Sequence, residues 1–427
     1  MIEKRRPTRR EFLRSALAAI AMPCVVSSTA LGAGDRAAPS NRLRLAHIGI
    51  GNQGSGHFGA MLGNRDVQIQ AVCDVKEQVR YGCQQRVDQQ YADERSKGTY
   101  KGCAAYNDFR DVMARTDIDA VIIAVPDHWH AIVACAAAAS GKDVYCEKPM
   151  ALTIREARKM ADTVRRYGRV FQTGSQQRSE DNFRYACELV RNGRIGKVQS
   201  VHVGVGGPSS ERYYPEEPVP PGFDWDMWQG PTPWHPYNAE RCSGNYGGGW
   251  RLVRDYSGGM MTDWGAHHFD IAQWGLGMDD SGPVEIHPPD GKEYKTLTYI
   301  YANGIPMHHG GANGILFTGT EGKIEVNRGY LKSWPDTLIR EPIAPGEIHL
   351  HKSRGGHHGD WFDSIRTRER PVADVEIGCR TVTVCHLGNI AYWTGHHLKW
   401  DPAKEEILGD DEAARWLDRP KRAPWAL

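Results

Sequence analysis

Apolar residues between positions 42 and 175 follow two alternating patterns. Short, nearly continuous apolar runs indicate strands that are buried on both faces, and stretches whose apolar residues recur every three or four positions indicate helices. The predicted strands cover residues 43–48, 67–72, 119–126, 143–146 and 169–173, and the predicted helices cover 76–97, 131–140 and 154–166. Because strands alternate with helices, we expect a doubly wound parallel sheet with helices on both faces.

The hydrophobic pattern changes near Gln176. A helix is predicted over 183–191, and apolar and polar residues then alternate with period two over 198–205, 294–301, 314–317 and 323–326. Strands of this kind with few helices between them predict an α/β domain with a large, mostly antiparallel open sheet. A further helical stretch is predicted over 360–393. We therefore expect one domain at 42–175 and a second at 176–427.

The first 33 residues differ from both domains in composition. A basic stretch at 8–14 (TRREFLR) precedes a mildly apolar run at 16–26 and small residues that end near Ala33. A membrane-anchoring helix is the alternative interpretation, but the apolar run contains Pro23 and is too short to span a bilayer. We expect a twin-arginine signal at 1–33, a linker at 34–41, and passage to the periplasm through the twin-arginine export machinery.

The first predicted strand ends in a glycine-rich stretch, residues 49–54 (GIGNQG), where a helix is predicted to begin. The first glycine permits a tight turn, the second lets backbone approach a pyrophosphate, and the third lets helix and strand pack closely. Asp74 lies twenty positions after Gly54, where a carboxylate accepts hydrogen bonds from ribose hydroxyls. This arrangement predicts NAD as cofactor, with NADP as an alternative because Lys76 and Arg80 follow closely. A surface turn is the alternative for the glycine triplet alone.

A second candidate constellation lies at residues 258–270 (GGMMTDWGAHHFD). On a helix, Asp263 and His267 would share one face. A carboxylate beside an imidazole suits proton transfer to and from a hydroxyl, because histidine titrates near neutral pH. Lys148 ends a predicted strand, at the sheet edge where ligands bind. Removing hydride from a secondary alcohol requires the hydroxyl proton to leave, and a nearby ammonium stabilises the developing charge. The alternative is a helix-capping aspartate with a core histidine.

Composition narrows the classes of function. The chain has 53 Lys and Arg against 52 Asp and Glu, so nothing favours nucleic acid or an anionic membrane as a partner. Its ten cysteines form no Cys-x-x-Cys pair, and Cys73, Cys135 and Cys146 lie in apolar strand or helix patterns, where they are expected to be small buried apolar residues. The histidines at 128, 308, 309, 357 and 358 match no zinc or two-histidine-one-carboxylate spacing, so no metal site is expected.

A long loop over residues 213–250 carries many tyrosines and tryptophans. Aromatic faces stack on the C–H faces of sugar rings, so Trp225, Trp228 or Trp234 is a candidate for a carbohydrate subsite. Packing within the domain or at a subunit interface is the alternative. The residues expected to contact substrate are His128, Trp225, Trp234 and His268.

Four motifs together resemble the glucose-fructose oxidoreductase and inositol dehydrogenase (Gfo/Idh/MocA) family. They are residues 49–54 with Asp74, Val125-Pro126 followed by His130, Glu147-Lys148-Pro149, and Gly258-Gly259 followed by Asp263 and His267. The resemblance covers nearly the whole chain after residue 41 and implies a Rossmann domain followed by an α/β domain whose open sheet mediates homo-oligomerisation. It implies that His267 accepts the proton of the substrate hydroxyl, that Lys148 bridges nicotinamide ribose and substrate, and that Asp263 orients the substrate. The cofactor-binding residues are then expected to be Gly49, Gly51, Asn52, Gln53, Gly54, Asp74, Pro126, His130, Glu147 and Lys148.

Export constrains the expected chemistry, because no nucleotide pool exists outside the cytoplasm. The cofactor is expected to be loaded before export and retained through turnover, as the resemblance of the leader to exported family members implies. We expect hydride transfer with a hydroxyl of a small-molecule carbohydrate (a sugar, polyol or glycoside), balanced by a second carbonyl compound or by an external electron acceptor. The alternative is a redox-neutral NAD-dependent glycosidase or lyase that acts through a transient keto-sugar. Outside enzymes, the alternative is a non-catalytic carbohydrate-binding protein on the same scaffold.

Overall fold

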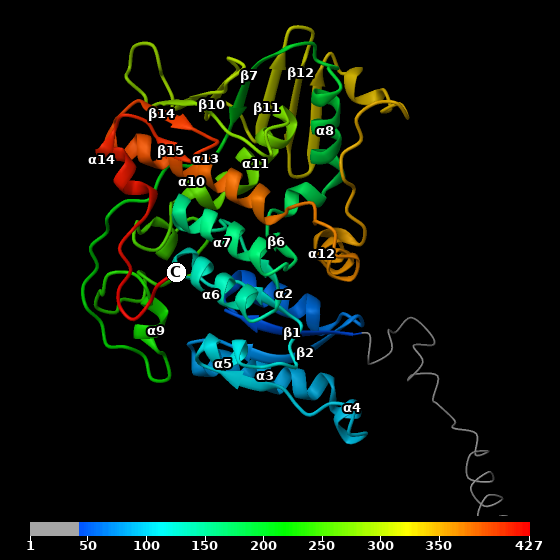
Figure 1. Ribbon diagram of the computed structural model, residues 1–427, viewed down its shortest axis with the longest axis vertical. Coiled ribbons are helices and arrows are strands. Elements are labelled where there is room, and N and C mark those ends of the chain that lie inside the picture. The colour runs from blue at the N-terminus through cyan, green and yellow to red at the C-terminus, as the bar shows by residue number, and fades with distance from the viewer. Residues whose placement is uncertain (1–41) are drawn as a thin grey trace, which may run out of the picture.

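The computed structural model describes residues 42–427, so the expected export signal at 1–33 and linker at 34–41 lie outside the described residues. Within 42–427 the chain forms a six-stranded sheet and a nine-stranded sheet, with helices packed between and around them (Figure 1). None of the helices in this part of the chain is long and apolar enough to cross a membrane.

The six-stranded sheet is parallel and has the strand order β3-β2-β1-β4-β5-β6. Its strands are β1 (Leu43–Ile48), β2 (Val67–Cys73), β3 (Ala104–Tyr106), β4 (Ala120–Ile123), β5 (Asp143–Cys146) and β6 (Phe171–Thr173). Its helices are α2 (Asn52–Leu62), α3 (Glu77–Gln90), α4 (Ala92–Ser96), α5 (Phe109–Met113), α6 (Asp127–Ala139) and α7 (Ile154–Arg166). The order reverses between β1 and β4, and the predicted doubly wound fold is confirmed.

Side chains of the six-stranded sheet alternate between two cores, because successive residues of a strand point to opposite faces. On one face, Ile48, Val121 and Val144 pack with α6 and α7. On the other face, Leu45 and Ile122 pack with α2 and α3. Since both faces are covered, these strands are continuous apolar runs in the sequence rather than alternating ones.

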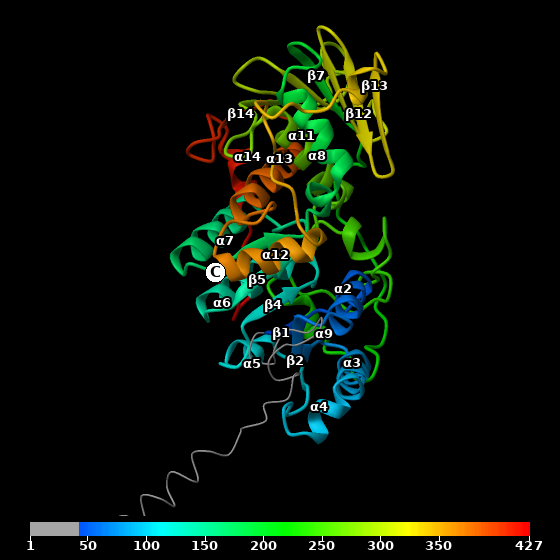
Figure 2. The same ribbon diagram turned by 90° about the vertical axis from the view of Figure 1, so that its right-hand side faces the viewer.

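The nine-stranded sheet has the order β13-β12-β11-β7-β10-β9-β8-β14-β15. Its strands are β7 (Val198–Val203), β8 (Glu285–His287), β9 (Thr298–Ile300), β10 (Pro306–His309), β11 (Ile315–Gly319), β12 (Lys323–Asn327), β13 (Tyr330–Trp334), β14 (Leu398–Asp401) and β15 (Glu406–Ile407). Its pairs are antiparallel except β7 with β10, so the predicted mostly antiparallel sheet is confirmed. The helices of this part are α8 (Asp181–Arg191), α9 (Trp225–Gln229), α10 (Met260–Asp263), α11 (Gly265–Leu276), α12 (Gly356–Thr367), α13 (Val375–Thr394) and α14 (Asp411–Ala414). Figure 2 shows α8, α11 and α13 on the side of this sheet that faces the rest of the molecule.

Several elements differ in extent from the prediction. The helix predicted from residue 131 begins at Asp127, directly after the extended residue Pro126. The strand predicted over 294–301 shortens to β9, and the short strands β8, β10, β14 and β15 were not predicted because so few residues show no period. The helical stretch predicted over 360–393 consists of α12 and α13, with Pro371 in the segment between them.

Helix α13 belongs to the cores of both sheets. Val375 and Val382 in its first half pack in a core of the six-stranded sheet, and Leu387 and Ile390 in its second half pack in the core of the nine-stranded sheet. Helix α12 places Trp361 in the core on the opposite face of the six-stranded sheet. Residues far beyond 175 therefore pack in the cores on both faces of the six-stranded sheet.

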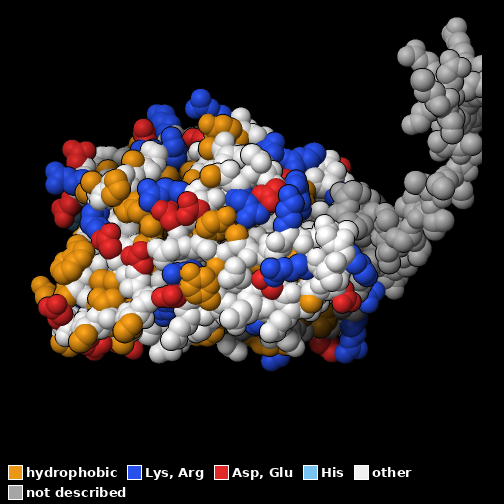
Figure 3. All heavy atoms as spheres, turned by 90° about the horizontal axis from the view of Figure 1, so that it is seen from below, with side chains coloured by type: hydrophobic (Ala, Val, Ile, Leu, Met, Phe, Trp, Pro, Cys, Tyr) orange, Lys and Arg blue, Asp and Glu red, His pale blue; other side chains and the backbone are white. Residues whose placement is uncertain are grey.

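Charged side chains of both signs are interspersed on the face in Figure 3, which looks at the end of the molecule formed by the six-stranded sheet and its helices. This mixture accords with the nearly equal numbers of positive and negative residues in the sequence, 53 and 52.

Gly54 and Gly51 provide a matched test of the packing at the start of α2. A Cβ atom at Gly54 would lie 2.2 Å from the carbonyl oxygen of Gly49, whereas one at Gly51 would meet no atom within 4 Å. We expect Gly54→Ala to lower the free energy of unfolding by roughly 2 kcal/mol or more. Gly51→Ala should leave it within about 1 kcal/mol of wild type. Urea unfolding followed by circular dichroism measures both, and equal losses in the two variants would contradict this packing.

Candidate active site

A cavity of about 390 Å³ lies at the carboxyl ends of β1, β2, β4 and β5, where the strand order of the first sheet reverses. Eight of the ten residues predicted to bind a cofactor line it: Gly49, Gly51, Asn52, Gln53, Asp74, Pro126, Glu147 and Lys148. Gly54 and His130 do not. Later segments of the chain form the remaining wall, which includes Asp263.

The three glycines of the loop after β1 occupy different environments. Gly49 has φ of 81°, and a Cβ atom there would lie 2.7 Å from the carbonyl oxygen of Ala124. Gly54 packs against the carbonyl of Gly49, so α2 starts in close contact with β1. Gly51 lines the cavity, and its backbone stays open to a ligand because nothing lies near its Cβ position.

Asp74 holds the glycine loop in place. Its Oδ2 accepts a hydrogen bond from the backbone N–H of Ile50 at 2.8 Å, and its Oδ1 accepts one from Lys76 at 2.9 Å. Burial raises the pKa of the Asp74 carboxyl, and the two backbone N–H groups partly offset that effect. The carboxylate stands on the cavity wall, where a ribose hydroxyl can donate to its remaining lone pairs.

Lys148 and Asp263 form an ion pair across the cavity wall. Lys148 follows β5 and Asp263 ends α10, and Nζ donates to Oδ1 at 2.6 Å. Both side chains are largely buried, with 13 % and 7 % of their surface exposed. The guanidinium of Arg251 approaches the same carboxylate, with Nε 3.6 Å from Oδ1. The pair brings together two residues that the sequence analysis assigned to catalysis.

His130 supports the backbone next to Lys148. It is fully buried, and its Nδ1 donates to the carbonyl oxygen of Pro149 at 2.7 Å. Burial lowers the pKa of His130, so its imidazole is neutral. The structure therefore gives His130 a contact with the strand-end turn, whereas the sequence analysis expected one with the cofactor.

Glu147 belongs to a buried hydrogen-bond chain that the sequence analysis did not predict. His57 on α2 contacts Oε1 of Glu147 through Nε2 at 2.7 Å and contacts Nε2 of His358 on α12 through Nδ1 at 2.9 Å. Burial alone would raise the pKa of Glu147. The hydrogen bond from His57 and the nearby positive groups outweigh the effect of burial, and together they lower the pKa of Glu147 to about 2. This chain ties α2, β5 and α12 together beside the cavity.

His267 lies in the first turn of α11, directly after the segment that carries Asp263. Asp263 and His267 fall on two short helices that meet at Trp264, not on one continuous helix as assumed from the sequence. Burial first, and then the charge of Lys148, lower the pKa of His267 well below its usual value. Its Nδ1 is buried without a hydrogen-bond partner, and the residue does not line the cavity.

Asp127 is a further titratable group on the cavity wall that the sequence analysis missed. It is fully buried at the start of α6, and its Oδ2 accepts a hydrogen bond from the hydroxyl of Ser257 at 2.6 Å. Burial raises the pKa of Asp127 to about 7, and the charge of Asp263 acts in the same direction. Asp127 directly follows Pro126 at the end of a predicted strand, and this position could have marked it as a site residue from the sequence.

The aromatic loop (residues 213–250) reaches back to the glycine loop and forms part of the cavity wall. The amide of Asn52 donates to the carbonyl oxygen of Gly244 at 2.8 Å, and the hydroxyl of Tyr246 donates to Oε1 of Gln53 at 3.2 Å. Gly244 and Tyr246 line the cavity together with Trp228. The loop was predicted from the sequence, but its contact with the glycine loop was not.

The four residues expected to contact substrate do not line this cavity. His128 and Trp225 are buried, and Nε2 of His128 bonds to the carbonyl oxygen of Trp228 at 2.8 Å, so these side chains anchor the aromatic loop. Trp234 is 58 % exposed. His268 is buried, with Nδ1 on the carbonyl oxygen of Gly204 at 3.1 Å, and burial lowers its pKa to about 4.

Comparisons with known proteins agree with this architecture. Residues 43–175 match the family model "Oxidoreductase family, NAD-binding Rossmann fold", and residues 208–427 match "Oxidoreductase family, C-terminal alpha/beta domain". The crystal structure of an aldose-aldose oxidoreductase from Caulobacter crescentus has the same fold, with a TM-score of 0.55 and 18% identity over 84% of this chain and 99% of that one.

Two curated relatives are similar over part of their length. One is the 2,7-anhydro-N-acetylneuraminate hydratase of Mediterraneibacter gnavus, 26% identical over 66% of this chain and 67% of that protein. The other is a glycosyl hydrolase family 109 protein of Shewanella baltica, 34% identical over 36% of this chain and only 33% of that protein. The two family models together cover well over half of the sequence, so the chain belongs to the Gfo/Idh/MocA family of oxidoreductases, with an NAD-binding Rossmann domain and the family's C-terminal α/β domain.

Proposed function

We propose that this protein transfers a hydride between a nicotinamide cofactor in the cavity and a secondary hydroxyl of a sugar, polyol or glycoside, and that it retains the cofactor through turnover. The observation that carries the proposal is the Lys148–Asp263 ion pair, which stands on the wall of the cavity that the glycine loop and Asp74 also line. A cofactor site and proton-handling side chains thus share one enclosed space.

The residues of the cavity fit a dinucleotide. Gly51 leaves its backbone open where a pyrophosphate would lie, and the carboxylate of Asp74 suits ribose hydroxyls. Bound NAD would supply the hydride acceptor and donor. Asp74 would repel a 2′-phosphate, which favours NAD, whereas Lys76 on the cavity wall and Arg80 beside Asp74 keep NADP as the alternative.

We assign proton transfer to the side chains around the ion pair. A neutral imidazole accepts protons, and the pKa of His267 is held low by burial and by Lys148. Lys148 would stabilise negative charge on the substrate oxygen as the hydroxyl proton leaves, and Asp263 would hold that ammonium and orient the substrate. In the reverse direction His267 would return the proton.

The aromatic loop supports retention of the cofactor. Its contacts with Asn52 and Gln53 place loop residues over the glycine turn, so a bound dinucleotide would be enclosed by segments from both parts of the chain. Retention is also what the export signal expected at 1–33 requires, because an exported protein has no nucleotide pool to draw on. We therefore propose a periplasmic protein that is exported with its cofactor through the twin-arginine machinery.

We also propose a homo-oligomer that forms through the open face of the nine-stranded sheet. Helices α8, α11 and α13 pack on one face of this sheet, and along β12 the buried residues Ile324 and Val326 alternate with residues that are half-buried or, at Lys323, exposed. On β13 the side chain of Trp334 is 48 % exposed. A large sheet face with an exposed tryptophan suits contact with a second copy.

Redox-neutral cleavage or hydration through a transient keto-sugar is the second candidate function. The similarity to a hydratase and to a glycosyl hydrolase family 109 protein favours it. In this reaction the hydride removed from the hydroxyl-bearing carbon would return to the same sugar after the cleavage or hydration step, so the cofactor would end in its starting state. His267 would take the hydroxyl proton during oxidation and give it back on reduction. Retention of the cofactor is compatible with both candidates.

Substitution of Lys148 and His267 tests the catalytic assignment. We expect Lys148→Ala and His267→Ala each to lower kcat by about 10²- to 10⁴-fold, because each removes a group that handles charge in the transition state. Turnover is measured with a carbohydrate identified from a panel of sugars and glycosides, and bound cofactor is measured in the same samples.

Lys159→Ala and His349→Ala are controls at exposed positions and should retain wild-type turnover. Undiminished turnover in Lys148→Ala and His267→Ala would contradict the catalytic assignment and favour a non-catalytic carbohydrate-binding protein.

Asp127 should make stability depend on pH. Its pKa is about 7 in the folded protein and about 4 in the unfolded chain, so the folded state binds the extra proton between these values. The stability contributed by protonated Asp127 is therefore present at acid pH and is lost as pH rises to about 7. The free energy of unfolding of Asp127→Asn, measured relative to wild type, should therefore rise by up to roughly 1 kcal/mol per pH unit between pH 4 and 7. Above that window the difference should stay constant. Denaturant unfolding from pH 5 to 8 measures the difference, and Asp280→Asn at an exposed position is the control. A constant difference between Asp127→Asn and wild type would contradict the assignment.

Tyr246 and Tyr213 provide a matched test of cofactor retention. Both belong to the aromatic loop, but Tyr246 contacts Gln53 on the cavity wall whereas the side chain of Tyr213 is 100 % exposed. We expect Tyr246→Ala to speed dissociation of bound nucleotide by about tenfold and Tyr213→Ala to leave it unchanged. Release into nucleotide-free buffer is followed by mass spectrometry of the filtrate. Equal dissociation rates in the two variants would argue against the loop as the retaining element.

A further inference from the structure

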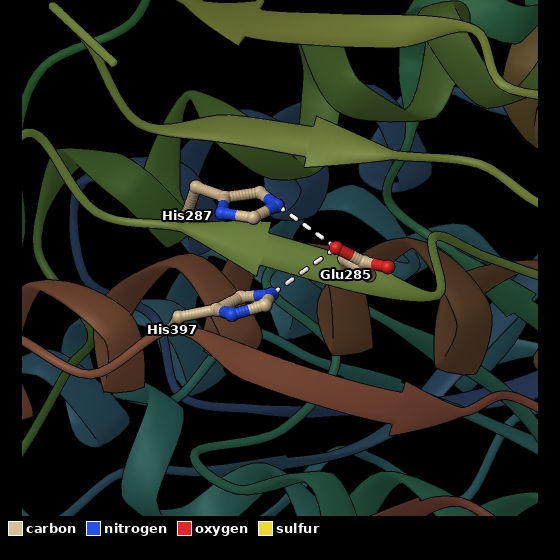
Figure 4. Close-up of side chains that lie close together, drawn as sticks. All are labelled: Glu285, His287 and His397. Carbon is tan, nitrogen blue, oxygen red and sulfur yellow. Dashed lines mark hydrogen bonds and ion pairs between the residues drawn. The ribbon is translucent and has the colours of Figure 1, made fainter. Parts of the chain in front are cut away.

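Three side chains with metal-binding atoms meet near one edge of the nine-stranded sheet, and none of them lines the cavity (Figure 4). Glu285 and His287 lie two residues apart on β8 and point to the same face. His397 directly precedes β14, which pairs antiparallel with β8 so that Leu398 lies opposite Ile286. This register puts His397 opposite His287, on the face that carries Glu285.

The donor atoms of these three side chains converge. Oε2 of Glu285 lies 3.0 Å from Nε2 of His287 and 3.2 Å from Nε2 of His397, and all three atoms lie within 4.8 Å of one another. Figure 4 shows both imidazoles directed at the same carboxylate. A tetrahedral ion with bonds of about 2.0–2.2 Å separates its ligands by roughly 3.4 Å. The spacing around Glu285 is therefore already close to that of a metal site.

The cluster is partly ordered by packing and partly open to solvent. The ring of His287 stacks on Tyr294 at 4.1 Å and on His397 at 3.9 Å, and 13 % of the His287 side chain is exposed. Glu285 and His397 expose 41 % and 40 % of their side chains. Two parallel rings cannot aim both lone pairs at one ion, so His397 has to turn its ring on binding, and its exposure leaves room for that.

We propose that Glu285, His287 and His397 bind a divalent transition-metal ion of the zinc class, with water in the fourth position. Two imidazoles and one carboxylate suit zinc, whereas magnesium and calcium prefer oxygen ligands. The hydrogen bonds that join the imidazoles to Glu285 would be replaced by bonds to the ion. No metal motif is visible in the sequence because two of the ligands lie on β8 and the third directly precedes β14, a strand that is adjacent to β8 in the sheet but distant from it along the chain.

An ion at this position would cross-link β8 to β14 and so fasten the last two strands, β14 and β15, to the sheet. Anything that binds the folded state alone raises its stability. Zinc is therefore expected to raise the melting temperature. Because the three ligands lie outside the cavity wall, the test of this site does not depend on the proposed hydride transfer.

The experiment uses the full protein without a polyhistidine tag, stripped of metal with a chelator. Isothermal titration with zinc chloride at neutral pH should show one ion per chain, and magnesium chloride should show no saturable binding. Glu285→Gln and His397→Ala change partly exposed side chains and should each weaken zinc binding by at least about tenfold. Circular dichroism checks that each variant keeps the wild-type fold.

His202→Ala is the matched control. The ring of His202 lies 4.9 Å from that of His308 on the same sheet, at an interplanar angle of 38°, and among the described residues His202 belongs to no group of three ligands. Its loss should leave zinc affinity and the zinc-dependent rise in melting temperature unchanged. Absence of saturable zinc binding to the wild type, or zinc binding that survives Glu285→Gln and His397→Ala unweakened, would overturn the proposal.

Discussion

The ion pair between Nζ of Lys148 and Oδ1 of Asp263, 2.6 Å apart, joins the two domains at the cavity, and the geometry of the candidate site depends on it. Lys148 comes from the end of β5 and Asp263 from the end of α10, so neither domain forms the pair alone. Loss of Asp263 would leave the largely buried ammonium of Lys148 without its carboxylate partner, whereas loss of Lys148 would leave Asp263 with Arg251 alone. Helix α13 contributes to the cores of both sheets, which fixes the two domains relative to each other and keeps the pair together.

The groups around this pair differ in protonation because their surroundings differ. Burial together with Lys148 keeps His267 neutral, whereas the hydrogen bond from His57 keeps Glu147 charged despite its burial. Asp127 has a pKa of about 7, so its charge changes near neutral pH. Lys148, Glu147, Asp127 and Asp263 line the cavity, and the neutral imidazole of His267 lies behind its wall. An ammonium, carboxylates and a neutral base are the components that proton transfer coupled to hydride transfer needs.

The sequence predicted the first domain well because its signals are local. Strands buried on both faces are continuous apolar runs, and the glycines at 49, 51 and 54 with Asp74 have fixed spacing. Short strands such as β8 and β10 were not predicted because three or four residues of mixed polarity show no period, whereas the equally short β4 is a continuous apolar run. Contacts between segments that are distant along the chain were not predicted from the sequence either. The docking of Gly244 on Asn52 depends on tertiary packing that no sequence pattern records, and so does the role of His128 as an anchor of the aromatic loop.

We propose that the cavity holds a nicotinamide cofactor that takes a hydride from a carbohydrate hydroxyl and gives it to a carbonyl group without leaving the protein, while the protein's own residues handle the hydroxyl proton. The most direct measurement mixes the protein, purified without added nucleotide, with a panel of sugars and glycosides and follows the absorbance of reduced nicotinamide in the bound fraction. We expect about one cofactor per chain, which becomes reduced when a carbohydrate is oxidised and is reoxidised within the same turnover or by a second carbonyl compound. Protein that carries no nucleotide and has no affinity for added NAD or NADP would contradict it.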